Sequence, residues 1–192
     1  MALTDCMEAI KALLNCVKAD GSHVSHVILE EKQEAKLKKL TISELGHGML
    51  LLDTDEGRKR KGSVVCMSPL FSDDGAYNHN CACDAVLLRQ HGDEIHACYI
   101  EMKSDKPSGY EGQFKSTQCF IRYVADLAET FCGITIKINR ERFVVFHTDS
   151  ANASRRGIKP KTRFEPRSAN TPKSPDMFCI SNNATVRFSE FF

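Results

Sequence analysis

The sequence predicts an α/β protein with a mixed β-sheet of about five strands flanked by helices. Apolar residues recur at helical spacing over residues 3–19 and again over residues 109–132. Between these segments, two apolar runs with strand-like character flank a short polar turn at residues 91–94. Helical and extended segments that alternate along one chain are typical of a sheet covered by helices.

Composition predicts one soluble domain that spans residues 1–192, with 42% apolar and 27% charged residues. The net charge of +1 gives no overall basic field that would indicate nucleic-acid binding. No apolar run approaches the roughly 20 residues of a membrane span, so we expect no membrane partner. Nine cysteines without an export signal favour reduced thiols and a cytoplasmic location, or a nuclear one in a eukaryotic or viral setting.

The first half of the chain is predicted to begin with an amphipathic helix over residues 3–19. Residues 24–29 fit either a short strand or a helix entry, and the charged run at 30–40 predicts a second helix. A basic turn at 58–61 fits an exposed loop, a phosphate contact or a nuclear-import signal, and residues 64–67 predict a strand.

The second half contains the helix with the clearest apolar stripe in the sequence. A capping box formed by Ser108 and Glu111 predicts its start, and Cys132-Gly133 predicts its end. Residues 134–138 and 143–147 are expected to be strands around a turn at 139–141, followed by closing strands at 178–181 and 186–188. The basic stretch at about 151–176 predicts a mobile loop that either follows a phosphate backbone or has no partner.

Three charged residues are expected to meet at one edge of the sheet. Asp84 begins the strand before the turn at 91–94, and Glu101 and Lys103 lie near the end of the strand after it. Residues two apart on a strand project from the same face, so Glu101 and Lys103 point together. Pairing about the turn brings Asp84 to the same end, where two carboxylates can hold Mg²⁺ or Mn²⁺ beside an ammonium group.

The spacing Asp84, hairpin, Glu101-Met102-Lys103, helix resembles the PD-(D/E)xK nuclease superfamily, although Cys83 stands where the motif has proline. The resemblance covers 83–123 and implies a restriction-endonuclease-like core (αβββαβ) with an extra N-terminal helix. It implies metal-dependent phosphodiester hydrolysis of nucleic acid, with DNA favoured over RNA. Asp84 and Glu101 would hold Mg²⁺ or Mn²⁺, and Lys103 would position the attacking water. Gln113 and Lys115, early in the following helix, are candidate substrate-binding residues; exposed helical positions are the alternative.

Several alternatives stay open from the sequence. The chain could be a non-cutting module that binds nucleic acid or protein, and either activity could need a homodimer or delivery by a partner protein. Glu8 and Glu44 are candidates for an additional acid in the site, with helix capping as the other interpretation of Glu8. His79, Cys81 and Cys83 invite a zinc interpretation, but paired zinc cysteines usually have two residues between them and here there is one.

Overall fold

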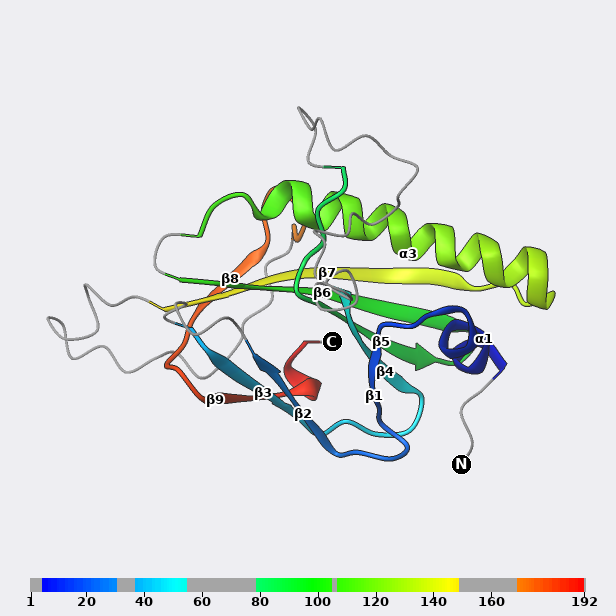
Figure 1. Ribbon diagram of the computed structural model, residues 1–192, viewed down its shortest axis with the longest axis horizontal. Coiled ribbons are helices and arrows are strands. Elements are labelled where there is room, and N and C mark those ends of the chain that lie inside the picture. Colours follow the sequence, from blue (N-terminus) through cyan, green and yellow to red (C-terminus); the bar gives the residue numbers. More distant parts are fainter. Residues whose placement is uncertain (1–4, 31–36, 55–78, 105–106, 149–168, 192) are drawn as a thin grey trace, which may run out of the picture.

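Strand pairing organises the protein into a six-stranded and a three-stranded β-sheet (Figure 1). The computed structural model describes residues 5–30, 37–54, 79–104, 107–148 and 169–191. Within these ranges the elements, in chain order, are α1 (Asp5–Leu13), β1 (Val17–Asp20), β2 (His26–Glu30), β3 (Lys39–Ser43), β4 (Met49–Asp53), β5 (Ala85–His91), β6 (Glu94–Lys103), α3 (Tyr110–Cys132), β7 (Lys137–His147), β8 (Asp176–Cys179), β9 (Ala184–Arg187) and the short 3-10 helix η1 (Phe188–Glu190).

The large sheet is mixed and has the order β1-β4-β5-β6-β7-β8. Its first four strands pair antiparallel, whereas β7 runs parallel to β6 and β8 parallel to β7. The connection from β6 to β7 contains α3, because two adjacent parallel strands need a long crossover that returns the chain to the end of the sheet where the first strand began. The prediction of an α/β protein with a mixed sheet is therefore confirmed, but the sheet has six strands rather than about five, and α1 and α3 both pack on one of its faces.

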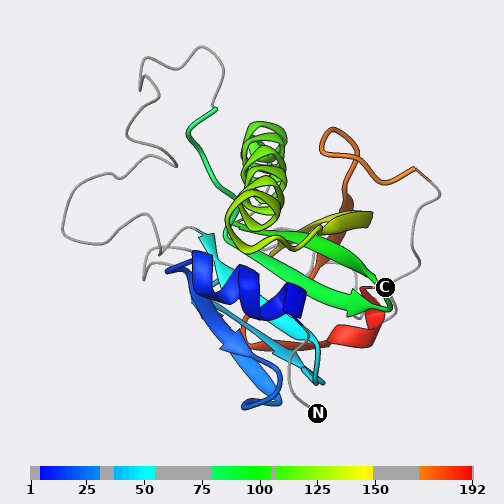
Figure 2. The ribbon, with the colours of Figure 1, turned by 90° about the vertical axis from the view of Figure 1, so that its right-hand side faces the viewer.

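Two apolar cores lie on opposite faces of the large sheet, because neighbouring residues of a strand face opposite ways. Val86 and Leu88 of β5 pack with α1 and α3, whereas Ala85 and Leu87 face the three-stranded sheet. Figure 2 shows these layers from the side, with α3 above the large sheet and the smaller sheet below it. None of the helices in the described ranges is long and apolar enough to cross a membrane.

The smaller sheet, of order β2-β3-β9, was not predicted. The helix expected at residues 30–40 is wrong at both ends of its span, because Glu30 ends β2 and Lys39 begins β3; residues 31–36 lie outside the described ranges. Glu30 and Lys39 are cross-strand partners whose charged groups lie 2.8 Å apart. Charges that suggested one face of a helix therefore pair across a hairpin.

The N-terminal helix is shorter than the predicted span of 3–19. It ends at Leu13, and Val17 already pairs with Leu52 of β4. A β-branched residue in a partly buried sheet position favours the strand over a continued helix, which corrects the prediction.

Two predicted strand pairs also need correction. Residues 137–147 form one strand rather than a hairpin, and Asn139 is a bulge, since Ile138 pairs with Ile95 and Arg140 with His96. The predicted closing pair separates into β8 in the large sheet and β9 in the small one. The predicted strand at 64–67, the basic turn at 58–61 and most of the basic loop at 151–176 lie outside the described residues.

Helix α3 follows its predicted span but begins differently. Gly109 is the residue before the first turn, in a left-handed conformation with φ of 76°, and no side chain caps the helix. Glu111 instead pairs with Lys115 at 2.6 Å, so the predicted capping box does not form. Gly133, with φ of 68°, ends the helix as predicted.

Candidate active site

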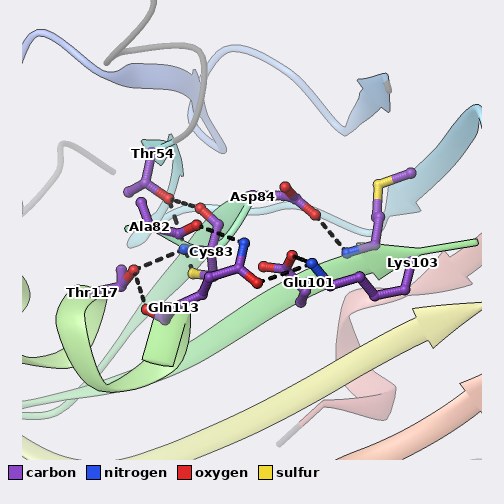
Figure 3. A network of polar contacts seen from close by, with 9 residues as sticks. Thr54, Ala82, Cys83, Asp84, Glu101, Lys103, Gln113 and Thr117 are labelled. Atoms are coloured by element: carbon purple, nitrogen blue, oxygen red, sulfur yellow. Dashed lines mark hydrogen bonds and ion pairs between the residues drawn. The ribbon is translucent and has the colours of Figure 1, made fainter. Parts of the chain in front are cut away.

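The predicted hairpin brings its charged residues to one end of the large sheet. Ala85 pairs with Ile100, so Asp84 and Glu101 are the next opposed positions beyond this pair. The Asp84 carboxylate accepts a hydrogen bond from the backbone N–H of Met102 at 2.5 Å, which ties the start of β5 to the end of β6. The two acids therefore come from the adjacent ends of two antiparallel strands (Figure 3).

Glu101 and Lys103 form an ion pair on the face of the sheet covered by α3. The Lys103 Nζ lies 2.5 Å from Glu101 Oε1, and the side chains are 24% and 1% exposed, respectively. The Glu101 carboxylate is thus enclosed in the protein, whereas the Lys103 side chain is partly exposed. A charge removed from water in this way needs a partner of opposite charge, and Lys103 supplies it.

Gln113, in the first turns of α3, connects this ion pair to the segment before β5. Its Oε1 accepts a hydrogen bond from Lys103 Nζ at 2.9 Å, and its Nε2 donates to the Ala82 carbonyl at 3.2 Å. Gln113 therefore belongs to the same polar network as Glu101 and Lys103 (Figure 3). The network fixes the lysine relative to both strands.

Two threonines that the sequence did not single out hold the backbone just before Asp84. Thr54 Oγ1 donates to the Cys83 carbonyl at 2.5 Å, and the Cys83 N–H donates to Thr117 Oγ1 at 2.9 Å. Thr117 lies four residues after Gln113, one helical turn further along α3. Both backbone groups of Cys83 are thus bound by side chains from two different elements.

The other predicted candidates lie outside this network. Lys115 is exposed and pairs with Glu111 along α3. Glu8 is exposed on α1. Cys6, on the same helix, is close enough to Asp93 for the charge of Asp93 to raise its pKa. Asp93 lies in the hairpin turn, so α1 is near the end of β6 that is remote from Lys103. Glu44 contacts Arg187 and Ser189, beside the smaller sheet.

Cys83 is a neutral thiol that packs within the site. Burial raises its pKa, and the neighbouring charges of Glu101 and Asp84 raise it further. Its Sγ donates to the Ala85 carbonyl at 3.3 Å. The raised pKa disfavours the thiolate, which is the form of cysteine that acts as a nucleophile.

The donor set suits a hydrated Mg²⁺ or Mn²⁺ ion better than zinc. In the described parts of the chain, no three His, Cys, Asp or Glu side chains come together as one metal-binding group. Structural zinc needs four such ligands, but Mg²⁺ retains several waters and is commonly held by one or two carboxylates. Asp84 and Glu101 meet that smaller requirement.

Neither protein-family models nor curated proteins nor solved structures give a match for this chain.

Proposed function

We propose that the protein is a divalent-metal-dependent nuclease of the PD-(D/E)xK kind. The observation that carries the proposal is the placement of these side chains at one end of the sheet: Lys103 contacts both Glu101 and Gln113, and Asp84 binds the backbone between Glu101 and Lys103. The order α1, β4, β5, β6, α3, β7 supports a restriction-endonuclease-like core, with β1 to β3 as additions between α1 and β4.

Each residue of the network has a role in the proposed hydrolysis. Asp84 and Glu101 would hold the Mg²⁺ or Mn²⁺ ion, which supplies Lewis-acid polarisation of the phosphate and a more acidic bound water. Lys103, the partly exposed member of the pair, would stabilise the negative charge that develops on an approaching phosphate. Gln113 keeps this ammonium in place through its 2.9 Å contact.

The start of α3 adds a second source of positive potential. The first N–H groups of a helix have no partner within the helix and point towards an approaching anion. Because Gln113 in this part of α3 contacts Lys103 directly, the helix start lies next to the carboxylates. A phosphodiester would therefore approach between the lysine and the helix start, with DNA as the favoured substrate.

The test is cleavage of supercoiled plasmid, linear duplex, single-stranded DNA and RNA in Mn²⁺, Mg²⁺ or EDTA. We expect cleavage that requires the metal and is abolished in Glu101→Gln and Lys103→Met. The matched control variants are Glu30→Gln and Lys39→Met, which change an exposed cross-strand pair of β2 and β3. The charged groups of Glu30 and Lys39 lie 2.8 Å apart, and their side chains are 57% and 52% exposed. These controls should retain activity.

Two outcomes would overturn the proposal. Full activity in the Lys103→Met variant would remove the lysine from the mechanism. Absence of cleavage on every substrate, together with no stabilisation by Mn²⁺, would favour the non-cutting binding module, because a ligand of the native state must raise its stability.

A further inference from the structure

A row of cationic and aromatic side chains crosses the large sheet at the end opposite to the candidate active site. Arg89 of β5 pairs with His96 of β6, and His96 pairs with Arg140 of β7. Paired residues on adjacent strands project from the same face, so these three side chains stand side by side. His91, two residues after Arg89, joins them, and its ring stacks on His96 with centroids 5.1 Å apart and planes 12° from parallel. We name Arg89, His91, His96 and Arg140 the hairpin patch.

The hairpin patch lies on the opposite face of the sheet from α3. Ile95 and Ala97, on either side of His96, pack in the core beneath the helix, which directs His96 to the other face. The Arg89 guanidinium sits over the Phe188 ring of η1, 5.6 Å from its centroid. Along β6, His96 and Lys103 are separated by roughly 23 Å at about 3.3 Å per residue. The patch is therefore distinct from the candidate active site.

The potential at the patch is positive. The pKa of His96 is lowered, first by burial and then by the positive charges of His91, Arg140 and Arg89, against which Glu94 is the weaker opposing influence. Glu94, the cross-strand partner of His91, accepts a hydrogen bond from Asn139, and its single carboxylate stands against two guanidinium groups. An anion placed over these groups would offset their mutual repulsion.

We propose that the hairpin patch binds a single-stranded segment of nucleic acid. Guanidinium and imidazole groups are planar, and both stack on nucleobases while their N–H groups donate to phosphates. Strands about 4.8 Å apart bring these planar groups side by side, and Arg140 and His91 at the margins of the patch are exposed. An acidic protein segment would use the charges but would gain nothing from the stacked rings. This inference is independent of the proposed nuclease activity.

The test is equilibrium binding of a short fluorescent oligothymidylate in EDTA, which excludes metal-dependent cleavage. We expect Arg140→Gln, a substitution at an exposed position, to weaken binding about tenfold, the effect typical of removing one charge-assisted hydrogen bond. The slope of log affinity against log salt should fall by about 0.7 for each phosphate that the variant no longer binds. Arg122→Gln makes the same charge change on α3, on the opposite face of the sheet, and should alter neither quantity.

A second comparison separates base stacking from general attraction to polyanions. Wild-type protein should bind oligothymidylate more tightly than an abasic strand of equal length, and His91→Ala should abolish that difference with little effect on the salt slope. Unchanged affinity and slope in Arg140→Gln would overturn the proposal. Equal binding of the abasic strand by the wild type would overturn it as well, because the patch would then attract any polyanion. Neither result bears on cleavage at Glu101 and Lys103.

Discussion

Replacing Lys103 with methionine tests whether the site is built around a buried charge. The substitution removes the 2.5 Å contact to Glu101 and the 2.9 Å contact to Gln113, and leaves a carboxylate that is 1% exposed without its counter-charge. Removing one partner of a buried ion pair costs about 3–5 kcal/mol. Since Lys103 is itself 24% exposed, water enters the vacated space, and we expect a decrease of about 2–3 kcal/mol in the free energy of unfolding.

The assay is urea unfolding at neutral pH, read as a change in midpoint at constant slope. Lys39→Met removes the lysine of the exposed pair with Glu30 and should cost about 0–1 kcal/mol. The double variant Glu101→Gln/Lys103→Met removes both charges of this pair, so it should recover most of the stability that Lys103→Met alone gives up. A cost no larger in Lys103→Met than in the control would refute the reasoning.

The same variant predicts a specific response to pH and to metal. A buried carboxylate that has lost its ammonium counter-charge binds a proton more readily in the folded than in the unfolded state, so the stability deficit of Lys103→Met should shrink as the pH falls. Mn²⁺ can replace the ammonium as counter-charge, and at a hundredfold excess over its dissociation constant it would add about 2.7 kcal/mol. Mn²⁺ should therefore stabilise Lys103→Met but not Glu101→Gln/Lys103→Met, and equal effects on the two would place the metal elsewhere.

Three further predictions follow from the core and the turns. Burial raises the pKa of Cys98 to about 12, so a thiol reagent at pH 8 should label the exposed Cys119 and spare Cys98, and mass spectrometry of native protein showing equal labelling would contradict this. Thr117→Val removes the hydroxyl that accepts a hydrogen bond from the buried Cys83 N–H at 2.9 Å. We expect the free energy of unfolding, measured by heat or urea, to fall by about 1–3 kcal/mol, and cleavage to fall as well because Cys83 precedes Asp84. Gly21→Ala should destabilise by about 1–3 kcal/mol in the same assays because its Cβ would lie 2.1 Å from the Gly46 carbonyl oxygen; Gly46→Ala, whose Cβ meets open space, is the control.

The part of the fold that sequence predicted best is contiguous in the chain. The segment from Asp84 through β6 to α3 depends on a short turn at Gly92, strand alternation and one long apolar stripe, all of which are local signals. The relative placement of Asp84, Glu101 and Lys103 follows from this hairpin alone, which explains why their convergence could be predicted.

Features that depend on long-range pairing were missed or misassigned. Thr54 reaches the Cys83 carbonyl across 29 positions, and no local pattern marks a threonine at a strand end as a partner for a distant backbone group. The charged run before β3 has spacing that fits a helix, yet Glu30 and Lys39 pair across strands. Local charge patterns do not distinguish these two solutions, because both bring opposite charges within reach.

The smaller sheet changes what the large sheet can present. It covers the face of β5 and β6 opposite α3 around Leu87 and Ile100, where both residues are fully buried. That cover stops short of the hairpin end, so Arg89 and His96 remain partly accessible beyond it. On the α3 side, the helix start meets the opposite end of the same strands. One hairpin therefore carries the candidate active site at one end and the hairpin patch at the other, on opposite faces, so a strand bound at the patch must pass around the sheet to reach Lys103.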